Sequence, residues 1–176
     1  MTGEKATNRI FMGLAAWAVG AYVYDVLWLP AQAAKKARSA ADETGGLLLN
    51  AGAGTPNSSV RAIVAGPTLW GDVNVDIAAD PSIPHGPDRV SYSDIQALPF
   101  KDNTFAACVA SHVVEHVPHP RKAIAELERV TNGPVFIIVP KWWCPHTWLH
   151  AGHRTFISDS GEIYPLWPQP VAGLLP

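Results

Sequence analysis

The sequence contains little cysteine and little charge. Two cysteines in 176 residues are too few for a scaffold held together by disulfide bonds. Charged residues make up 16% of the chain, well below the fraction of about 25% that is usual in soluble domains. Seven tryptophans and a hydrophobic share of 48% exclude intrinsic disorder. The net charge of -2 offers no electrostatic attraction for nucleic acid, so we expect no nucleic-acid partner.

A long apolar segment lies near the N-terminus. Residues 10–30 contain one charged side chain, Asp25. In a helix these 21 residues extend about 31 Å, close to the hydrocarbon thickness of a bilayer, ~30 Å. Aromatic side chains, which favour the membrane interface, lie toward one end of the segment at Tyr22, Tyr24 and Trp28. We therefore predict one membrane-spanning helix within residues 1–30.

Two other interpretations of this segment are open. One is a secretory signal peptide, because Ala31-Gln32-Ala33 fits a cleavage site for signal peptidase. The other is the buried helix of a soluble protein, because a charged side chain at the centre of a bilayer costs about 2.5–3.5 kcal/mol. The segment is longer than the apolar core of a signal peptide, and Asp25 lies near its end rather than at its centre. Both facts favour the membrane helix.

Basic residues flank the apolar segment unevenly. Lys35, Lys36 and Arg38 follow it, whereas Lys5 and Arg9 precede it together with an acidic residue. The positive-inside rule then places the C-terminal domain on the cytoplasmic side. We expect a single-pass membrane protein with a cytoplasmic domain.

Small residues occupy one face of the same predicted helix. Gly13, Ala16 and Gly20 have the spacing that lets a second helix approach closely. Asp25 also prefers a protein neighbour to lipid. We therefore expect a membrane-protein partner or a helix–helix contact at this face; the alternative is that glycine and alanine are simply common in membrane helices.

After an amphiphilic linker at 31–46, apolar runs alternate with helical patterns. A chain of 176 residues is long enough for one domain with its own core and an appendage. Strand-like runs and one helical pattern lie at 47–50, 73–77, 90–92, 105–110, 120–130 (the helix) and 135–139. They predict an α/β domain over 47–140 with a mainly parallel sheet of about five strands flanked by helices. The proline-rich tail at 141–176 has room for a short hairpin, from 155–157 and 162–164.

A glycine-containing turn follows the first predicted strand. Gly52 and Gly54 allow a ligand to approach the backbone there, because glycine has no Cβ. Asp76 ends the second predicted strand about 20 residues later, where a carboxylate accepts hydrogen bonds from the hydroxyls of a ribose. The third glycine of the dinucleotide fingerprint is missing, and Pro56 stands near its place. The pattern predicts a nucleoside-containing cofactor that has no pyrophosphate.

Three motifs in a fixed order carry a more specific resemblance. Residues 93–105 read SDIQALPFKDNTF, residues 110–120 read ASHVVEHVPHP, and residues 126–130 read ELERV. They resemble the class I S-adenosylmethionine-dependent methyltransferases, which read approximately D-x-x-x-LPF-x-D-x-x-FD, then EH-V-x-x-P, then E-L-x-R-V. The resemblance covers residues 47–140 and implies a Rossmann-like fold. Ala106 replaces the aspartate that the family usually has after the phenylalanine.

The resemblance implies S-adenosylmethionine as the cofactor, held at the carboxyl ends of the first four strands. Asp76 would hold the ribose hydroxyls, and Asp94 would accept from the adenine amino group; alternatively, Asp94 caps a turn. Asn50 stands where the family usually has an acidic residue, and its side chain can still accept a hydrogen bond. The cofactor-binding residues that the resemblance implies are Asn50, Gly52, Gly54, Asp76, Ile77, Asp94, Ile95 and Ser111.

The tail is rich in tryptophan and histidine. Its pairs His150-x-x-His153 and Cys144-x-His146 match no standard zinc spacing well, so we assign no metal ligands. The resemblance places the acceptor-site loop after the fifth strand, and we expect the tail to line that pocket. Structural packing or contact with the membrane surface is one alternative, and a metal site is another.

Together these observations predict a membrane-anchored S-adenosylmethionine-dependent methyltransferase whose acceptor is small or membrane-associated. Transfer to oxygen or nitrogen needs a base within hydrogen-bond reach, and we expect His112 first and His146 second in that catalytic role. Tethering to a membrane concentrates membrane-associated acceptors near the site. The alternative is a non-catalytic methyltransferase-like subunit of a larger membrane protein complex, which Asn50 and the short tail favour.

Overall fold

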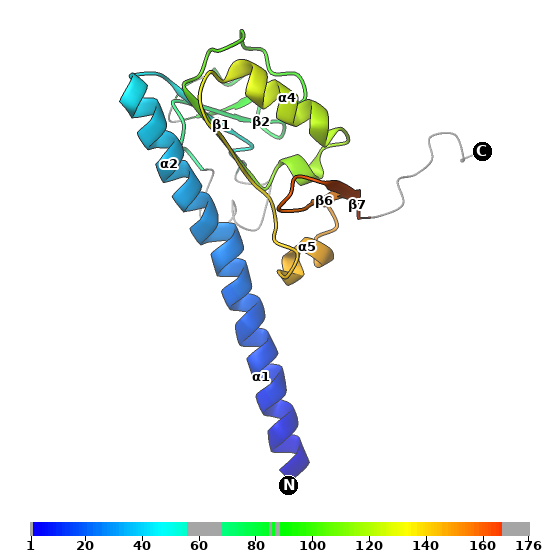
Figure 1. The fold of residues 1–176 in the computed structure, drawn as a ribbon. Coiled ribbons are helices and arrows are strands. Elements are labelled where there is room, and N and C mark those ends of the chain that lie inside the picture. The colour runs from blue at the N-terminus through cyan, green and yellow to red at the C-terminus, as the bar shows by residue number, and fades with distance from the viewer. Residues whose placement is uncertain (1, 56–67, 85, 87–88, 167–176) are drawn as a thin grey trace, which may run out of the picture.

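A five-stranded parallel sheet forms the centre of the molecule (Figure 1). The computed structural model describes residues 2–55, 68–84, 86 and 89–166. The strand order is β3-β2-β1-β4-β5, and all four pairings are parallel. This confirms the predicted Rossmann-like α/β fold. The strands are β1 (Leu48–Ala51), β2 (Val73–Asp76), β3 (Val90–Tyr92), β4 (Ala107–Ser111) and β5 (Val135–Ile138).

Helices cover both faces of this sheet (Figure 1). Helix α2 (Leu29–Thr44) packs against Ala107 and Val109 of β4. Helix α4 (Pro120–Val130) belongs to the core that contains Cys108 and Ala110 of the same strand. Alternate residues of β4 therefore face opposite layers, as the two-residue period of a strand requires. Because both faces are covered, the strand is apolar throughout, which is typical of a buried parallel sheet.

Residues 31–46, expected as a linker, form most of α2. Ala34, Ala37 and Ala41 are buried at helical spacing, so small side chains bring this helix close to the sheet. The helix ends at Gly45, whose φ of 64° is left-handed and whose N–H bonds back to the Asp42 carbonyl at 3.1 Å. The glycine stop was visible in the sequence, whereas the packing of the alanine face was not.

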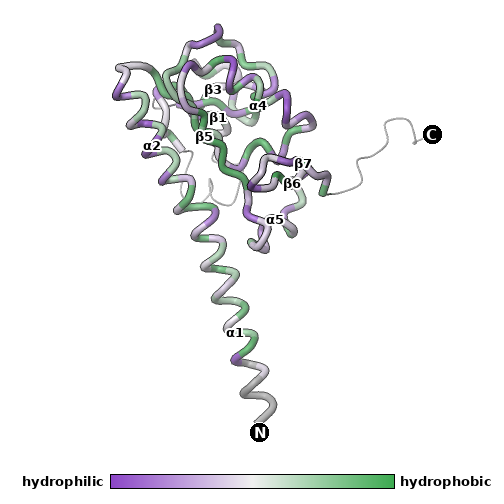
Figure 2. Tube along the Cα trace, viewed as in Figure 1, coloured by the Kyte–Doolittle hydropathy of each residue, from purple (hydrophilic) through white to green (hydrophobic). Residues whose placement is uncertain are grey.

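The chain before α2 is helical as well and leaves the domain (Figure 1). Helix α1 (Thr2–Tyr22) continues through a π-helical turn, η1 (Val23–Trp28), into α2. Among the described residues this is the one helix long and apolar enough to cross a membrane. Figure 2 shows the apolar colouring of its projecting part. The large apolar side chains exposed there are Ile10, Phe11, Met12, Leu14, Trp17 and Val19.

The π-helical turn lies where this long helix meets the domain. Asp25 within it is 0% exposed. Its carboxylate accepts a long hydrogen bond from the N–H of Lys141, at 3.3 Å. Its backbone carbonyl oxygen lies 3.0 Å from Nε2 of His112. The one acidic residue of the apolar segment therefore contacts the protein's own domain.

The described part of the tail, up to residue 166, packs beside the carboxyl end of the sheet. Helix α5 (Pro145–Leu149) is followed by the strands β6 (Thr155–Ile157) and β7 (Ile163–Pro165). The two strands pair antiparallel, which confirms the predicted hairpin. Ile157 and Ile163 join the core on the α4 side of the sheet. The tail thereby brings its histidines to the edge where the motif residues end.

Candidate active site

A cavity of about 640 Å³ lies at the carboxyl ends of the strands. In open parallel sheets this is the position where ligands bind. Its volume falls within the range of about 300–1,000 Å³ that is usual for small-molecule sites. Seven of the eight cofactor-binding residues expected from the sequence line it: Gly52, Gly54, Asp76, Ile77, Asp94, Ile95 and Ser111.

The glycine turn and the acidic end of β2 are bonded to each other. Oδ2 of Asp76 accepts a hydrogen bond from the Gly54 N–H at 2.9 Å, and Oδ1 accepts one from the Ala78 N–H at 2.8 Å. Each carboxylate oxygen retains further acceptor capacity, so Asp76 can still accept from the hydroxyls of a ligand in the cavity. Pro56, the residue near the missing third glycine, lies outside the described residues.

Gly52 has a conformation that other residues rarely adopt. Its φ is 78°, and a Cβ built there would lie 2.6 Å from Cβ of Val113. Both the dihedral angle and the close approach of Val113 require glycine. The glycine therefore brings β1 and the segment after β4 together at the cavity wall.

The loop after β3 forms another part of the wall. Asp94 accepts from the backbone N–H of Gln96 at 2.8 Å, so it caps a turn and lines the cavity at the same time. Ile95 is buried and joins the core, whereas Ile77 after β2 is exposed. Ser111 ends β4 at the cavity.

Asn50 lies behind the cavity wall rather than in it. Its side chain is 1% exposed. The amide donates to the Thr68 carbonyl and, at 3.0 Å, to Oδ1 of Asn74. Asn50 therefore connects β1 to β2 and to Thr68, which itself lines the cavity. A direct contact between Asn50 and a ligand stays a prediction.

His112 is held on both sides of its ring. Nε2 faces the carbonyl oxygen of Asp25 at 3.0 Å, and Nδ1 lies 3.5 Å from Oε1 of Glu115. Burial alone would lower the pKa of His112, but the Glu115 carboxylate and the Asp25 carbonyl raise it above its usual value. The backbone φ of 53° is unusual for histidine and adds a local constraint. His112 forms an ion pair with the buried Glu115 when its ring is protonated.

Glu115 is the other half of this pair. It lies in the short 3-10 helix η2 (Val114–His116) and is 1% exposed. Burial alone would raise the pKa of Glu115, but His112 and His116 lower it below its usual value. Neither carboxylate oxygen has a hydrogen-bond partner within the described part of the chain. A buried carboxylate of this kind needs positive charge beside it.

Four histidines gather on the tail side of the cavity. His146, at the start of α5, has ring centroids 5.0 Å from both His150 and His153. His116 of η2 lies 4.8 Å from His153 by the same measure. Burial and the neighbouring histidines lower the pKa of His146 to about 4. His146 therefore remains neutral at physiological pH.

Comparison with known proteins agrees with this arrangement. Residues 73–138 match the family described as "Methyltransferase domain". A protein of Mycobacterium marinum named "Uncharacterized methyltransferase" is 35% identical over 160 residues, which cover 88% of this chain and 58% of the relative. A protein of Mycobacterium ulcerans with the same name is 34% identical over the same shares. Over residues 73–138 the chain is therefore similar to methyltransferase domains, and its Rossmann-like sheet agrees with that similarity.

The chain spans 58% of the length of these two relatives. A third methyltransferase, from Mycobacterium tuberculosis, is 34% identical over 83 residues, which are 46% of this chain and 31% of that protein. The family match over residues 73–138 contains the acidic end of β2, the loop after β3 and the segment after β4. These are the elements that bring most of the motif residues to the cavity.

One wall of the cavity was not anticipated from the motifs. Tyr22, Val26 and Pro30 of the N-terminal helix line it together with the strand ends. These positions recur every four residues, and such spacing places side chains on one face of a helix. This spacing is visible in the sequence, but it does not stand out because almost every residue of the segment is apolar.

Proposed function

We propose that this chain is a membrane-anchored methyltransferase domain that transfers the methyl group of S-adenosylmethionine to a small or membrane-associated acceptor. The composition of the cavity wall carries this proposal. Its lining includes the motif residues at the strand ends and also Tyr22, Val26 and Pro30 from the apolar helix. A single cavity therefore lies between a nucleoside-type site and the segment that would enter a bilayer.

The motif residues fit the cofactor. Asp76 has acceptor capacity for the ribose hydroxyls, and Gly54 keeps the nearby backbone free of a side chain. Ile77 and Ile95 offer apolar contacts for the adenine, beside Asp94. Bound there, the cofactor supplies an electrophilic methyl group on a sulfonium. The chain's own contribution is to orient the acceptor for in-line attack and to exclude water.

His146, rather than His112, is the better candidate for the base that removes the acceptor's proton. The ring nitrogens of His112 face Asp25 and Glu115, so neither is available to a substrate. His146 also lines the cavity; its Nδ1 is buried without a hydrogen-bond partner among the described residues, as is Nδ1 of His112, but no described carboxylate or carbonyl is bonded to its ring, so we assign a substrate's approach to its Nε2. Its low pKa makes it a weak base. It would therefore take a proton only as positive charge develops on the acceptor atom.

Exposed aromatic and apolar side chains support the membrane part of the proposal. They come from η1, the start of the tail and α5, and Tyr24 stacks on Trp28 with ring centroids 5.1 Å apart. Leu149 of α5 is 80% exposed. Tryptophan and tyrosine favour the bilayer interface. The group comprises Tyr24, Leu27, Trp28, Trp142, Trp148 and Leu149.

This aromatic group also bears on the length of the anchor. Ala21 is buried and the helix contacts the domain from there onward, so residues 10–20 are the free apolar part, about 17 Å long. That is shorter than the hydrocarbon core, ~30 Å. The aromatic group extends the apolar surface along the same axis, which favours a domain seated on the membrane surface. In that position Gly13, Ala16 and Gly20 remain exposed for a partner helix, and the domain faces the cytoplasm.

Binding of S-adenosylmethionine to the full chain in detergent micelles, measured by calorimetry, tests the proposal. We expect micromolar binding by the wild type and its loss in Asp76→Asn. Asp80→Asn is the matched control, because Asp80 accepts from the N–H two residues on at 2.8 Å, as Asp76 does, but lies outside the cavity. No binding by folded wild type, as judged by circular dichroism, would overturn the proposal and favour a non-catalytic subunit.

A further inference from the structure

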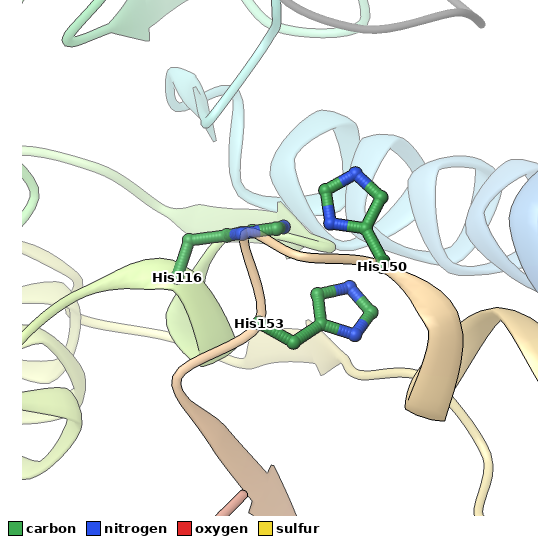
Figure 3. Close-up of side chains that lie close together, drawn as sticks. All are labelled: His116, His150 and His153. Carbon is green, nitrogen blue, oxygen red and sulfur yellow. The ribbon is translucent and has the colours of Figure 1, made fainter. Parts of the chain in front are cut away.

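Three histidine side chains lie close together (Figure 3), and two of them, His116 and His150, line the cavity. His116 comes from η2, whereas His150 and His153 come from the segment between α5 and β6. One ring nitrogen from each residue lies within 4.8 Å of the others. From the sequence, a metal site was one alternative for these histidines, but no ligands were assigned because their spacing matches no standard zinc motif.

The hydrogen bonds of two of these rings point their free nitrogens at one another. Nδ1 of His116 donates to the Gly152 carbonyl at 2.8 Å, and Nδ1 of His153 donates to the Thr147 carbonyl at 2.9 Å. In each neutral ring the lone pair is then on Nε2. Histidines that bind metals typically donate their other N–H to a backbone carbonyl in this way. Nε2 of His153 is buried and has no hydrogen-bond partner in the described structure.

His150 is the exposed member of the set. Its ring is stacked on His153 with centroids 4.6 Å apart. Its Nδ1 accepts a long hydrogen bond of 3.2 Å from the Gly152 N–H. This bond is weak enough to be broken when His150 binds a metal ion. This residue can therefore move toward the other two without disturbing the core.

A buried negative charge lies next to the same nitrogens. Oε1 of Glu115 is 3.8 Å from Nε2 of His116 and 4.0 Å from Nε2 of His153. The carboxylate is 1% exposed and has no hydrogen-bond donor among the described residues. Besides its pairing with His112 at 3.5 Å, this carboxylate has unused acceptor capacity, and a buried acceptor without hydrogen bonds is costly. A cation held between Glu115 and the histidines would reduce that cost.

We propose that His116, His150, His153 and Glu115 bind a divalent transition-metal ion of the zinc type. Three imidazoles and one carboxylate are a ligand set that suits Zn²⁺. Tetrahedral zinc with Zn–N bonds of about 2.0–2.1 Å places its nitrogen ligands about 3.4 Å apart. Side-chain rotations that move each ring nitrogen by about 1 Å bring the nitrogens to that spacing. The proposal goes beyond methyl transfer, and it stands whether or not the chain binds S-adenosylmethionine.

Cobalt is the appropriate probe, because tetrahedral Co²⁺ absorbs visible light whereas Zn²⁺ does not. The full chain, carrying no polyhistidine tag and treated with a chelator in detergent, is titrated with Co²⁺ and then with Zn²⁺. We expect a visible spectrum that saturates at one equivalent of Co²⁺ and disappears when Zn²⁺ is added. Absence of both a spectrum and a calorimetric heat with Zn²⁺ would overturn the proposal.

Variants distinguish metal binding at this site from nonspecific metal binding by other histidines. His150→Ala removes an exposed ligand with little risk to folding and is expected to weaken metal binding at least about tenfold. Glu115→Gln preserves the shape of the side chain and is expected to weaken binding as well. His119→Ala is the control, because His119 is exposed and lies outside the set, three residues from His116. An equal effect of His119→Ala and His150→Ala would refute the assignment, as would unchanged binding in His150→Ala.

Discussion

Nε2 of His112 donates a hydrogen bond of 3.0 Å to the backbone carbonyl oxygen of Asp25. These two residues are 87 positions apart, and the bond joins the segment after β4 to the π-helical turn of the N-terminal helix. π-Helical turns are rare and are found frequently at functional sites. The histidine that the sequence pointed to as a base is thus bonded to the helix that leaves the domain.

The first prediction concerns the pair of His112 and Glu115. His112→Ala leaves the Glu115 carboxylate buried without its nearest positive charge, and loss of one partner of a buried pair costs about 3–5 kcal/mol of unfolding free energy. Denaturant unfolding followed by circular dichroism measures this loss. The double variant with Glu115→Gln is expected to lose less than the sum of the two single variants. Additive losses would show that the two side chains do not interact.

The second prediction concerns Gly52. Gly52→Ala places a methyl group against Val113 in a left-handed conformation, so we expect a loss of more than the ~1–2 kcal/mol that the conformation alone costs. Gly161→Ala is the matched control, because Gly161 has a φ of 83° and open space around it. Unfolding experiments on both variants isolate the contact with Val113. An equal loss in the two variants would contradict this explanation.

The third prediction concerns Arg129, which connects two of the motifs noted in the sequence. Arg129 donates to the carbonyls of Leu98 and Phe100 at 3.1 and 2.9 Å. It also forms an ion pair of 2.7 Å with Glu126, whose Oε2 accepts from the Leu98 N–H. Arg129→Ala should lower the melting temperature clearly. Arg121→Ala, an exposed residue of the same helix, should not.

The same group predicts a pH dependence of stability. The hydrogen bond from Arg129 lowers the pKa of Glu126 below its ordinary value of 4.5. A carboxyl group with a lowered folded-state pKa stabilises the protein above pH 4.5, and this stability is lost as the pH falls through the folded-state pKa. Melting temperatures of the wild type and Glu126→Gln should therefore converge as the pH is lowered below 4.5. A constant difference between them at low pH would contradict the role of Arg129.

The fourth prediction concerns the apolar helix. Leu14 is exposed, so Leu14→Arg changes no contact in the core but costs about 2.5–3.5 kcal/mol if the position lies at the centre of a bilayer. We expect reduced flotation of the variant with liposomes in a density gradient. Ser39→Arg adds the same charge to the exposed face of α2 and should float as the wild type does. Equal flotation of Leu14→Arg and the wild type would place this residue outside the bilayer.

The motifs predicted the sheet and one side of the cavity for a physical reason. Asp76 and Ser111 are the last residues of β2 and β4, and Asp94 follows β3. The carboxyl ends of parallel strands meet at one edge of a sheet, so the approach of these residues follows from the strand pattern. The contacts that remained hidden depend on how separate segments pack. The Asp25–His112 bond and the approach of His116 to His150 are of this kind. The spacing of residues along the sequence predicts neither contact.

The absence of a break between α1, η1 and α2 has a consequence for how acceptors are found. Residues 2–44 form one helix of about 65 Å, and its second half is packed against the sheet. A domain held by such a rod cannot swing on a flexible tether. If the first half lies in a bilayer, the cavity stays at a constant height above it, and encounters are confined to two dimensions. The rate of encounter would then follow the surface density of the acceptor in the membrane rather than its concentration in the surrounding solution.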